Sequence, residues 1–303
     1  MQDLAIYKNT RLPLNHYLIL VLLITFSFSN SLQNSFVWDD TALIVDNPKI
    51  NMPFKEIPSI FLTPLWDVGR NSAESSQSYY RPIVTLLYSL NYKLWGPNPV
   101  GFHITDILLH MMITIVLYKT GLFLFNNDKL ISLIATSIFA VHPAHNEPVG
   151  RAASGEVIFG FFIILSVYFF LKEKKCLSWI AFSFTLLSKE SAVMLSFALF
   201  FYAYHKEGFK KGIIKIFPYL LLTGLYLILR MKIVDTVLGD DVGQPAFTRL
   251  LTMIVATFDY IRLLIIPYPQ NPIYPGRWYV SITEPKVLIS VLVVTSIILL
   301  SIR

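Results

Sequence analysis

The sequence has little cysteine and little charge. Its one cysteine, Cys176, excludes a disulfide within the chain. Only 15% of its 303 residues are Asp, Glu, Lys or Arg, whereas soluble domains carry about 25%. In their place, 54% of the residues are hydrophobic and the mean hydropathy is +0.57. These values argue against an ordinary soluble protein and favour a membrane protein.

Motifs of several soluble enzyme classes are also missing. The chain has no glycine-rich loop to hold phosphate and no G-x-S-x-G, so a nucleotide-binding fold and a serine hydrolase have no support. The net charge of +6 would fit a nucleic-acid partner, but the basic residues fall in short gaps between apolar segments. That distribution is typical of membrane topology, and no nucleic-acid partner is expected.

Apolar segments recur along the whole chain. A spanning helix needs about 20 mostly apolar residues. The segments that reach or approach this length are 15–33, 103–125, 130–147, 155–171, 213–230 and 286–302, and shorter ones occupy 83–95, 177–187, 191–204 and 248–266. The pattern predicts an all-α, multi-pass membrane protein in which residues 1–303 form a single domain with about eight to ten membrane helices. The first segment follows Lys8 and Arg11 but precedes no small-x-small cleavage site, which favours an uncleaved helix over a signal peptide.

Lysines and arginines predict the orientation of these helices. They gather in the N-terminal tail, in the KEKK gap at 172–175 and in the gap at 205–215, which should therefore be cytoplasmic. The first loop, 34–82, holds six acidic and four basic residues and should lie outside. Its prolines and its apolar stretch at 57–65 predict short helices along the membrane surface, and Asn71–Ser78 reads as a linker.

Four polar clusters fall on this predicted outer face: Asp39-Asp40, Tyr80-Arg81-Pro82, His142 to Glu147, and Lys189-Glu190. Charges near a membrane are costly unless they are paired or hydrated, so each cluster is a candidate site. Each also has an ordinary structural interpretation. The two aspartates can be solvated loop acids, Arg81 can reach lipid headgroups, the histidines can be plain loop residues, and Lys189 can pair with Glu190. Four such coincidences on one face are less expected than any single one.

A zinc site is the metal-binding alternative for the third cluster. His142 and His145 have a spacing that permits it, with Glu147 nearby. However, Pro143 and Pro148 are expected to break any helix there, and no further ligand set is evident. We therefore expect no metal.

A carboxylate and a guanidinium at an outer membrane surface suit one kind of chemistry. The carboxylate can take a proton from a hydroxyl that attacks carbon, and the guanidinium can hold a phosphate as it leaves. Since phosphate is already a good leaving group, one general base is enough, whereas glycosidases use two carboxylates. This combination predicts transfer of a sugar from a lipid phosphate.

Four ordered blocks resemble the GT-C superfamily of membrane glycosyltransferases, in particular the transmembrane O-mannosyltransferases related to those acting on cadherins. They are FVWDDTALIVDNPKI (36–50), YYRPIVTLLYSLNYKLWGPNPVGFHITDILLH (79–110), AVHPAHNEPVGRAASGE (140–156) and LLSKESAVML (186–195). The resemblance implies a GT-C-like helical bundle that transfers a sugar, mannose in most such enzymes, from a polyprenyl-phosphate donor to a hydroxyl. The resemblance also implies that this transfer proceeds with inversion, on the periplasmic or luminal side.

The resemblance also implies roles for particular residues. Asp39 is the preferred base with Asp40 in support, although the reverse order stays open. Arg81 is the candidate for the donor phosphate, with Lys189 as a second cation. The cavity and acceptor candidates are His103, His142, His145, Glu147, Arg151 and Glu190. The expected partners are the bilayer, the lipid-linked sugar and a secreted or membrane protein with Ser or Thr hydroxyls, and no cofactor is expected.

Relatives in this group usually carry more membrane helices and a C-terminal array of tetratricopeptide repeats. This sequence stops at Arg303, so it is either a short member or a truncated one. A bacterial inner membrane is the favoured location, and the endoplasmic reticulum membrane applies if the source is eukaryotic. Three alternatives remain: an enzyme that glycosylates a lipid or surface polymer, a transporter or flippase of lipid-linked sugars, and a structural membrane subunit. A transporter should show internal repeats and mid-membrane polar sites, and neither is visible.

Overall fold

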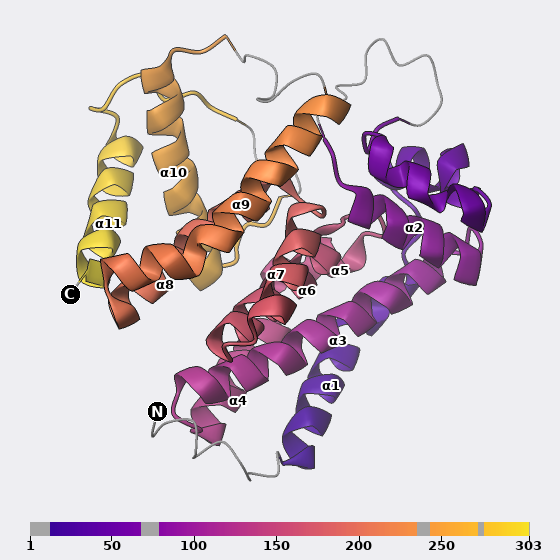
Figure 1. Ribbon diagram of the computed structural model, residues 1–303, viewed down its shortest axis with the longest axis horizontal. Coiled ribbons are helices and arrows are strands. Elements are labelled where there is room, and N and C mark those ends of the chain that lie inside the picture. Colours follow the sequence, from indigo (N-terminus) through magenta and orange to yellow (C-terminus); the bar gives the residue numbers. More distant parts are fainter. Residues whose placement is uncertain (1–12, 68–78, 235–242, 272–275, 303) are drawn as a thin grey trace. The chain divides into compact units, whose positions relative to one another are not determined.

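The computed structural model describes residues 13–67, 79–234, 243–271 and 276–302, and every regular element within them is a helix (Figure 1). The all-α prediction is therefore confirmed. Two features used above, the Lys8 and Arg11 pair and the Asn71–Ser78 linker, lie outside the described residues.

The α-helices are α1 (Leu14–Phe28), α2 (Pro82–Trp95), α3 (Pro99–Leu124), α4 (Lys129–Ala140), α5 (Asn146–Gly150), α6 (Glu156–Leu171), α7 (Lys175–Leu186), α8 (Val193–Glu207), α9 (Phe209–Ile233), α10 (Ala246–Ile265) and α11 (Pro285–Ile302). Short 3-10 helices are η2 (Ser29–Gln33), η4 (Pro48–Asn51), η5 (Phe54–Leu62), η6 (Pro143–His145) and η7 (Glu190–Ala192), and η3 (Thr41–Val45) is a π-helix. The chain divides into two compact units, Met1–Val237 and Leu238–Arg303.

Within the described residues, three helical segments are long and apolar enough to cross a bilayer: Leu14–Gln33, Pro99–Leu124 and Phe209–Ile233. Helices α4, α6, α7 and α11 are apolar but shorter. These lengths agree with an all-α membrane protein, and the expected total of about eight to ten membrane helices stays a prediction.

The predicted span 130–147 is wrong at its C-terminal end. Helix α4 begins after Asp128, whose Oδ1 accepts the N–H groups of Leu130 and Ile131 at 3.0 and 2.9 Å. It ends at Ala140, because Pro143 cannot continue a helix and starts η6 instead. Pro148 does not break a helix as expected. It lies in the first turn of α5, where a missing N–H costs nothing.

Helix α3 is central to the first unit, where it packs against α1, α4 and α6 (Figure 1). Helices α6 and α7 form a close antiparallel pair. Ser178 on α7 donates its hydroxyl to the carbonyl of Ser166 on α6 at 2.8 Å, and both residues are fully buried. Small hydroxyl residues let membrane helices approach closely and satisfy each other, which explains their place in an otherwise apolar pair.

One face of α9 is apolar and exposed. Five apolar residues follow one another on this face at three- or four-residue spacing, and each is more than half exposed: Ile214, Phe217, Leu221, Leu225 and Ile228. A continuous apolar stripe of this kind is costly in water but stable against lipid. It is the surface expected of a membrane helix.

The first loop folds into short helices, as predicted, and η3, η4 and η5 form them. Helix α2 fixes this loop. Ser89 donates its hydroxyl to the carbonyl of Ile50 at 2.9 Å, and Lys93 donates to the carbonyl of Met52 at 2.6 Å. The acidic pair therefore starts a segment that is tied to the helical body rather than free in solvent.

The second unit contains α10 and α11, which pack on each other. Leu251, Val255 and Val287 are buried between them. Asp259, the acid within the predicted apolar segment 248–266, accepts a hydrogen bond from Lys286 on α11 at 2.7 Å. The pair neutralises a charge that a membrane environment would otherwise penalise.

Candidate functional site

Asp40 is fully buried at the start of the first loop. Its Oδ2 accepts the N–H of Val37 at 3.0 Å, and its Oδ1 accepts the N–H of Ala153 at 2.9 Å. Burial raises the pKa of Asp40 above the usual carboxyl value, although the two N–H groups and the charge of Arg151 oppose this shift. Both carboxylate oxygens are occupied, so Asp40 supports the local backbone.

Asp39 has a different environment, although it is the adjacent residue. Its side chain is 48% exposed, and its Oδ2 lies 3.9 Å from Nη1 of Arg151. The same nitrogen lies 3.7 Å from Oε1 of Glu147. Arg151 thus sits between two partly exposed carboxylates, and Asp39 keeps lone pairs that can accept a proton or a hydrogen bond.

The Arg81 guanidinium is paired with Glu190. Its Nε donates to Oε2 of Glu190 at 3.0 Å, and its Nη2 lies 3.0 Å from the same oxygen. The other oxygen of Glu190 accepts the N–H of Tyr80 at 3.2 Å. The guanidinium carbon also stands 4.5 Å from the centre of the Tyr79 ring, so its orientation is held from two sides.

Lys189 and Glu190 do not pair with each other, so that interpretation is wrong. Lys189 instead donates to Oε1 of Glu156 at 2.5 Å. The extended backbone of Lys189 sends its side chain away from that of its neighbour. The two candidate phosphate-binding cations, Arg81 and Lys189, therefore each have their own carboxylate.

Gly155 determines where Glu156 lies, because it precedes α6 with a φ of +64°. A Cβ at this position would stand 2.9 Å from Cγ1 of Val84, which is too close. Glycine therefore allows both the left-handed turn and the approach of α2. Sequence reasoning missed Glu156, and the signal available was an acid that opens a wholly apolar helix.

A cavity of about 280 Å³ lies beside Glu156. His145 lines it together with side chains of α3 and α6, among them Ile113, Leu117 and Ile164. The cavity is thus mostly apolar, and its polar lining residues are Glu156, His145 and His110.

His145 packs against two rings. Its ring centre lies 4.9 Å from that of His110 and 4.5 Å from that of Phe139. Burial, followed by His110 and His142, lowers the pKa of His145 to about 4. His142 accepts the N–H of Ala144 on its Nδ1 at 3.2 Å and so caps η6. Among the described residues, no group of three His, Cys, Asp or Glu could hold a metal ion.

His103 and Asp106 lie one turn apart on α3 and are both buried. In the part of the chain that the structure describes, Oδ2 of Asp106 and Nε of Arg151 have no hydrogen-bond partner. His103 and Asp106 are both near enough to Asp40 to interact electrostatically. Sequence reasoning missed Asp106, although a carboxylate inside a predicted membrane span was the available signal.

Tyr88 on α2 links the two halves of this arrangement. It is buried and lies near enough to Asp40, Arg151, Arg81 and Asp106 for their charges to act on it. The structure therefore gathers Asp39, Asp40, His103, Glu147 and Arg151 around one end of α3, and Arg81, Glu190, Lys189 and Glu156 around the adjoining start of α2 and α6. The chemistry available to this assembly is proton acceptance at Asp39 and anion binding at Arg81 and Lys189.

Comparison with known proteins found curated relatives. The chain is 32% identical over 189 residues to the Caenorhabditis elegans protein O-mannosyl-transferase F38B6.6, a match that covers 60% of this chain and 27% of the relative. It is 39% identical over 131 residues to the human protein O-mannosyl-transferase TMTC1, covering 41% of this chain and 14% of the relative. It is 32% identical over 158 residues to the mouse protein O-mannosyl-transferase TMTC3, a match that covers 52% of this chain and 17% of the relative.

The resemblance expected from the four sequence blocks is thereby confirmed: the chain is similar to protein O-mannosyl-transferases. It spans about a quarter or less of the length of these relatives. No family model matches the chain, and no solved structure matches it.

Proposed function

We propose that this chain is a membrane glycosyltransferase that moves a sugar, with mannose as the first candidate, from a polyprenyl-phosphate donor to a Ser or Thr hydroxyl of a protein. The reaction takes place on the outer or luminal side of the membrane. The names of the similar proteins support sugar transfer to protein. The observation that carries the proposal is the accessible carboxylate of Asp39 beside the buried and anchored Asp40.

Asp39 is the general base in this proposal. A base must reach the substrate proton, and Asp39 is half-exposed whereas Asp40 has both oxygens occupied by backbone N–H groups. Asp40 holds the turn that presents Asp39 and joins it to the segment that carries Arg151. Arg151 lies 3.9 Å from Asp39 and can orient its carboxylate.

Arg81 and Lys189 bind the donor phosphate. Arg81 uses Nε and Nη2 on Glu190, which leaves Nη1 without a bond to any described residue and available to an anion. Lys189 reaches the phosphate by exchanging its bond to Glu156 for one to the ligand. These cations supply the positive charge that the departing phosphate needs, and the proposal requires no metal.

The cavity beside Glu156 suits the first part of the lipid chain. Most of its lining is apolar, and Glu156, His145 and His110 supply polar groups, a combination that suits an isoprenoid attached to a phosphate. A volume of about 280 Å³ holds only a short stretch of such a chain. The remainder would lie in the bilayer.

The reaction is a single displacement. As the acceptor oxygen forms a bond to the anomeric carbon, its proton passes to Asp39. The bond between that carbon and the phosphate oxygen breaks, and its electron pair stays on the phosphate, which Arg81 and Lys189 stabilise. One displacement inverts the configuration at the anomeric carbon, so an α-linked product would arise from a β-linked donor.

The test uses the purified full chain in lipid nanodiscs with a radiolabelled polyprenyl-phosphate mannose and a membrane-protein fraction. We expect label in protein, released by mild alkali as an O-linked sugar, and a rate of labelling at least about 100-fold lower with the Asp39→Asn variant. Label found only in lipid or polymer would show that the acceptor is not a protein. In proteoliposomes, donor that crosses the bilayer without any transfer would indicate a transporter instead.

A further inference from the structure

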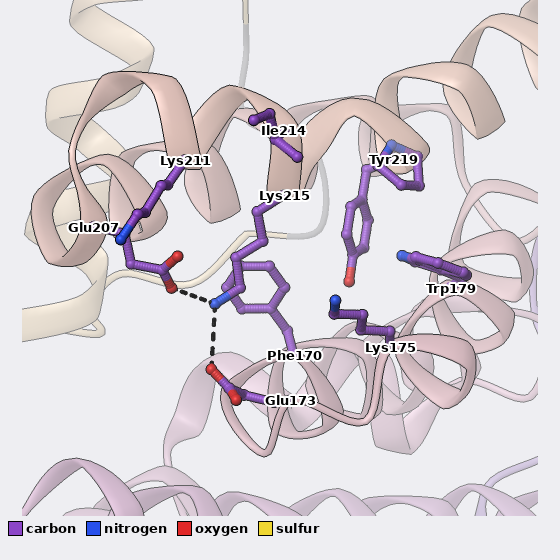
Figure 2. Close-up of a pocket in the computed structure, with 10 residues that line it drawn as sticks. Phe170, Glu173, Lys175, Trp179, Glu207, Lys211, Ile214, Lys215 and Tyr219 are labelled. Carbon is purple, nitrogen blue, oxygen red and sulfur yellow. Dashed lines mark hydrogen bonds and ion pairs between the residues drawn. The ribbon is translucent and has the colours of Figure 1, made fainter. Parts of the chain in front are cut away.

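A second cavity lies in the first unit, at the opposite end of α6 from Glu156. Helix α6 has 16 residues, so its two ends are about 24 Å apart. The cavity has a volume of about 470 Å³ (Figure 2). It is lined by Phe170, Glu173, Lys175, Trp179, Glu207, Lys211, Ile214, Lys215, Pro218 and Tyr219. The proposed transfer reaction uses none of these residues.

The segments that form its mouth are strongly basic. Residues 172–175 and 205–215 together contain seven lysines and two glutamates. Both glutamates are already used, because Lys215 lies 2.6 Å from Glu207 and 3.7 Å from Glu173 (Figure 2). Lys175 and Lys211 make no ion pair with the described residues. The cavity thus holds two uncompensated positive charges.

The wall of the cavity is apolar and aromatic. Its lining includes Phe170, Trp179, Pro218 and Tyr219, and Figure 2 shows the Lys175 side chain extending toward the hydroxyl end of Tyr219. Ile214, at the edge, is 72% exposed and begins the apolar stripe of α9. A ligand in this cavity would therefore meet positive charge, an aromatic wall and the start of a lipid-facing helix surface.

Basic pockets at the cytoplasmic ends of membrane helices are suited to anionic lipid headgroups, since lysines bind the phosphate while the acyl chains stay in the bilayer. The lysine distribution places these two segments on the cytoplasmic side. Tryptophan is common at the same depth, where its ring lies between chain and headgroup. A soluble phosphate would satisfy the lysines and leave the aromatic wall unused.

We propose that this cavity binds the phosphate headgroup of an anionic lipid from the cytoplasmic leaflet, with Lys175 and Lys211 on the phosphate and the first acyl carbons against Trp179. The site is separate from the proposed transferase centre, and its test involves no sugar transfer.

The test measures lipid binding to the purified full chain by native mass spectrometry. The probes are phosphatidic acid, phosphatidylcholine with the same acyl chains, and inorganic phosphate. The double variant Lys175→Gln/Lys211→Gln removes the two unpaired charges. The matched control Lys206→Gln/Lys210→Gln removes the same charge from two exposed positions of the basic segment 205–215 that do not line the cavity. All of these lysines are exposed, so the variants should fold.

We expect the cavity variant to bind phosphatidic acid about tenfold more weakly than the unchanged chain, and the control to differ by less than about twofold. Lipids with dibrominated acyl chains should quench the fluorescence of Trp179 in the unchanged chain. In the Trp179→Phe variant, this part of the quenching should be absent. Equal losses in both double variants would show a diffuse surface effect and overturn the proposal. So would equal binding of phosphatidylcholine, or full competition by inorganic phosphate.

Discussion

The Asp40 carboxylate joins two segments that are 113 residues apart, because its Oδ1 accepts the backbone N–H of Ala153 at 2.9 Å. Asp39, the residue before it, is half-exposed and lies beside Arg151. Two identical side chains in adjacent positions therefore have separate tasks. One holds the loop against the α5–α6 connection, and the other faces solvent. Substitutions can distinguish these tasks.

Asp39→Asn should lower the transfer rate by about 10²–10⁴-fold, because an amide cannot take the acceptor proton. Asp39 is half-exposed and accepts no hydrogen bond from the described backbone, so the melting temperature should stay nearly unchanged. Initial rates with labelled donor and thermal unfolding in detergent measure the two effects. A rate equal to that of the unchanged chain would reject Asp39 as the base.

Asp40→Asn is the matched contrast, with the same chemical change one residue away. The amide nitrogen would face one of the two N–H groups of Val37 and Ala153, which should cost about 1–3 kcal/mol of unfolding free energy. Any loss of rate should then accompany this loss of stability. If Asp40→Asn were fully stable but inactive while Asp39→Asn kept its rate, the roles of the two acids would be reversed.

Arg81→Ala should raise the KM for the lipid-linked donor by about tenfold or more, because a charge-assisted bond to phosphate is lost. The KM for the acceptor should change less. The donor KM of Arg81→Lys should lie between those of the unchanged chain and of Arg81→Ala, since lysine keeps the charge but lacks the planar guanidinium group that binds phosphate with two N–H groups. Steady-state kinetics with each substrate varied in turn give the comparison. A larger effect on acceptor than on donor would place Arg81 elsewhere in the reaction.

His145 should make stability depend on pH. Its folded-state pKa is about 4, below the unfolded value of about 6.5. The contribution of His145 to the free energy of unfolding is therefore complete above pH 6.5. It is lost as the pH falls toward 4, because the unfolded chain binds a proton that the folded chain does not. The total is at most about 3 kcal/mol.

His145→Gln removes this titration. Between pH 7.5 and 4.5, thermal unfolding should therefore show a smaller decline in stability for the variant than for the unchanged chain. Parallel declines in the two proteins would mean that His145 titrates normally in the folded state.

Cys176 offers a natural test of topology. It is exposed and directly follows the KEKK gap that should be cytoplasmic. A membrane-impermeant maleimide should label it in inverted vesicles and not in right-side-out vesicles. In a Cys176→Ala background, Lys55→Cys in the exposed first loop should show the opposite pattern. Labelling of both positions from the same side would overturn the predicted orientation.

Much of the helical framework could be predicted because it depends on local composition. The segment 155–171 corresponds to α6, and 286–302 corresponds to α11, since an apolar run between polar residues marks a helix wherever it packs. The span 130–147 failed at its end, where hydropathy continued past Ala140 but the backbone turned at Pro143. Hydropathy does not register such a local steric effect.

The candidate site could be predicted only in part. Asp39, Asp40 and Arg151 appeared as candidates because they are charged residues at the edges of apolar segments. Glu156 and Asp106 were missed, since nothing in their spacing relates them to Lys189 or Asp40. Their partners come from other helices, and contacts of that kind follow from packing.

The sequence by itself determined that the chain is helical and apolar and that it carries acids and cations at the ends of its helices, because composition and periodicity are local properties. Only the tertiary structure decided which acid is accessible and which is fixed, and that Lys189 pairs with Glu156 while Glu190 pairs with Arg81. The physical reason is distance along the chain. A hydrogen bond such as that from Ala153 to Asp40 spans 113 residues and exists only once the helices have packed.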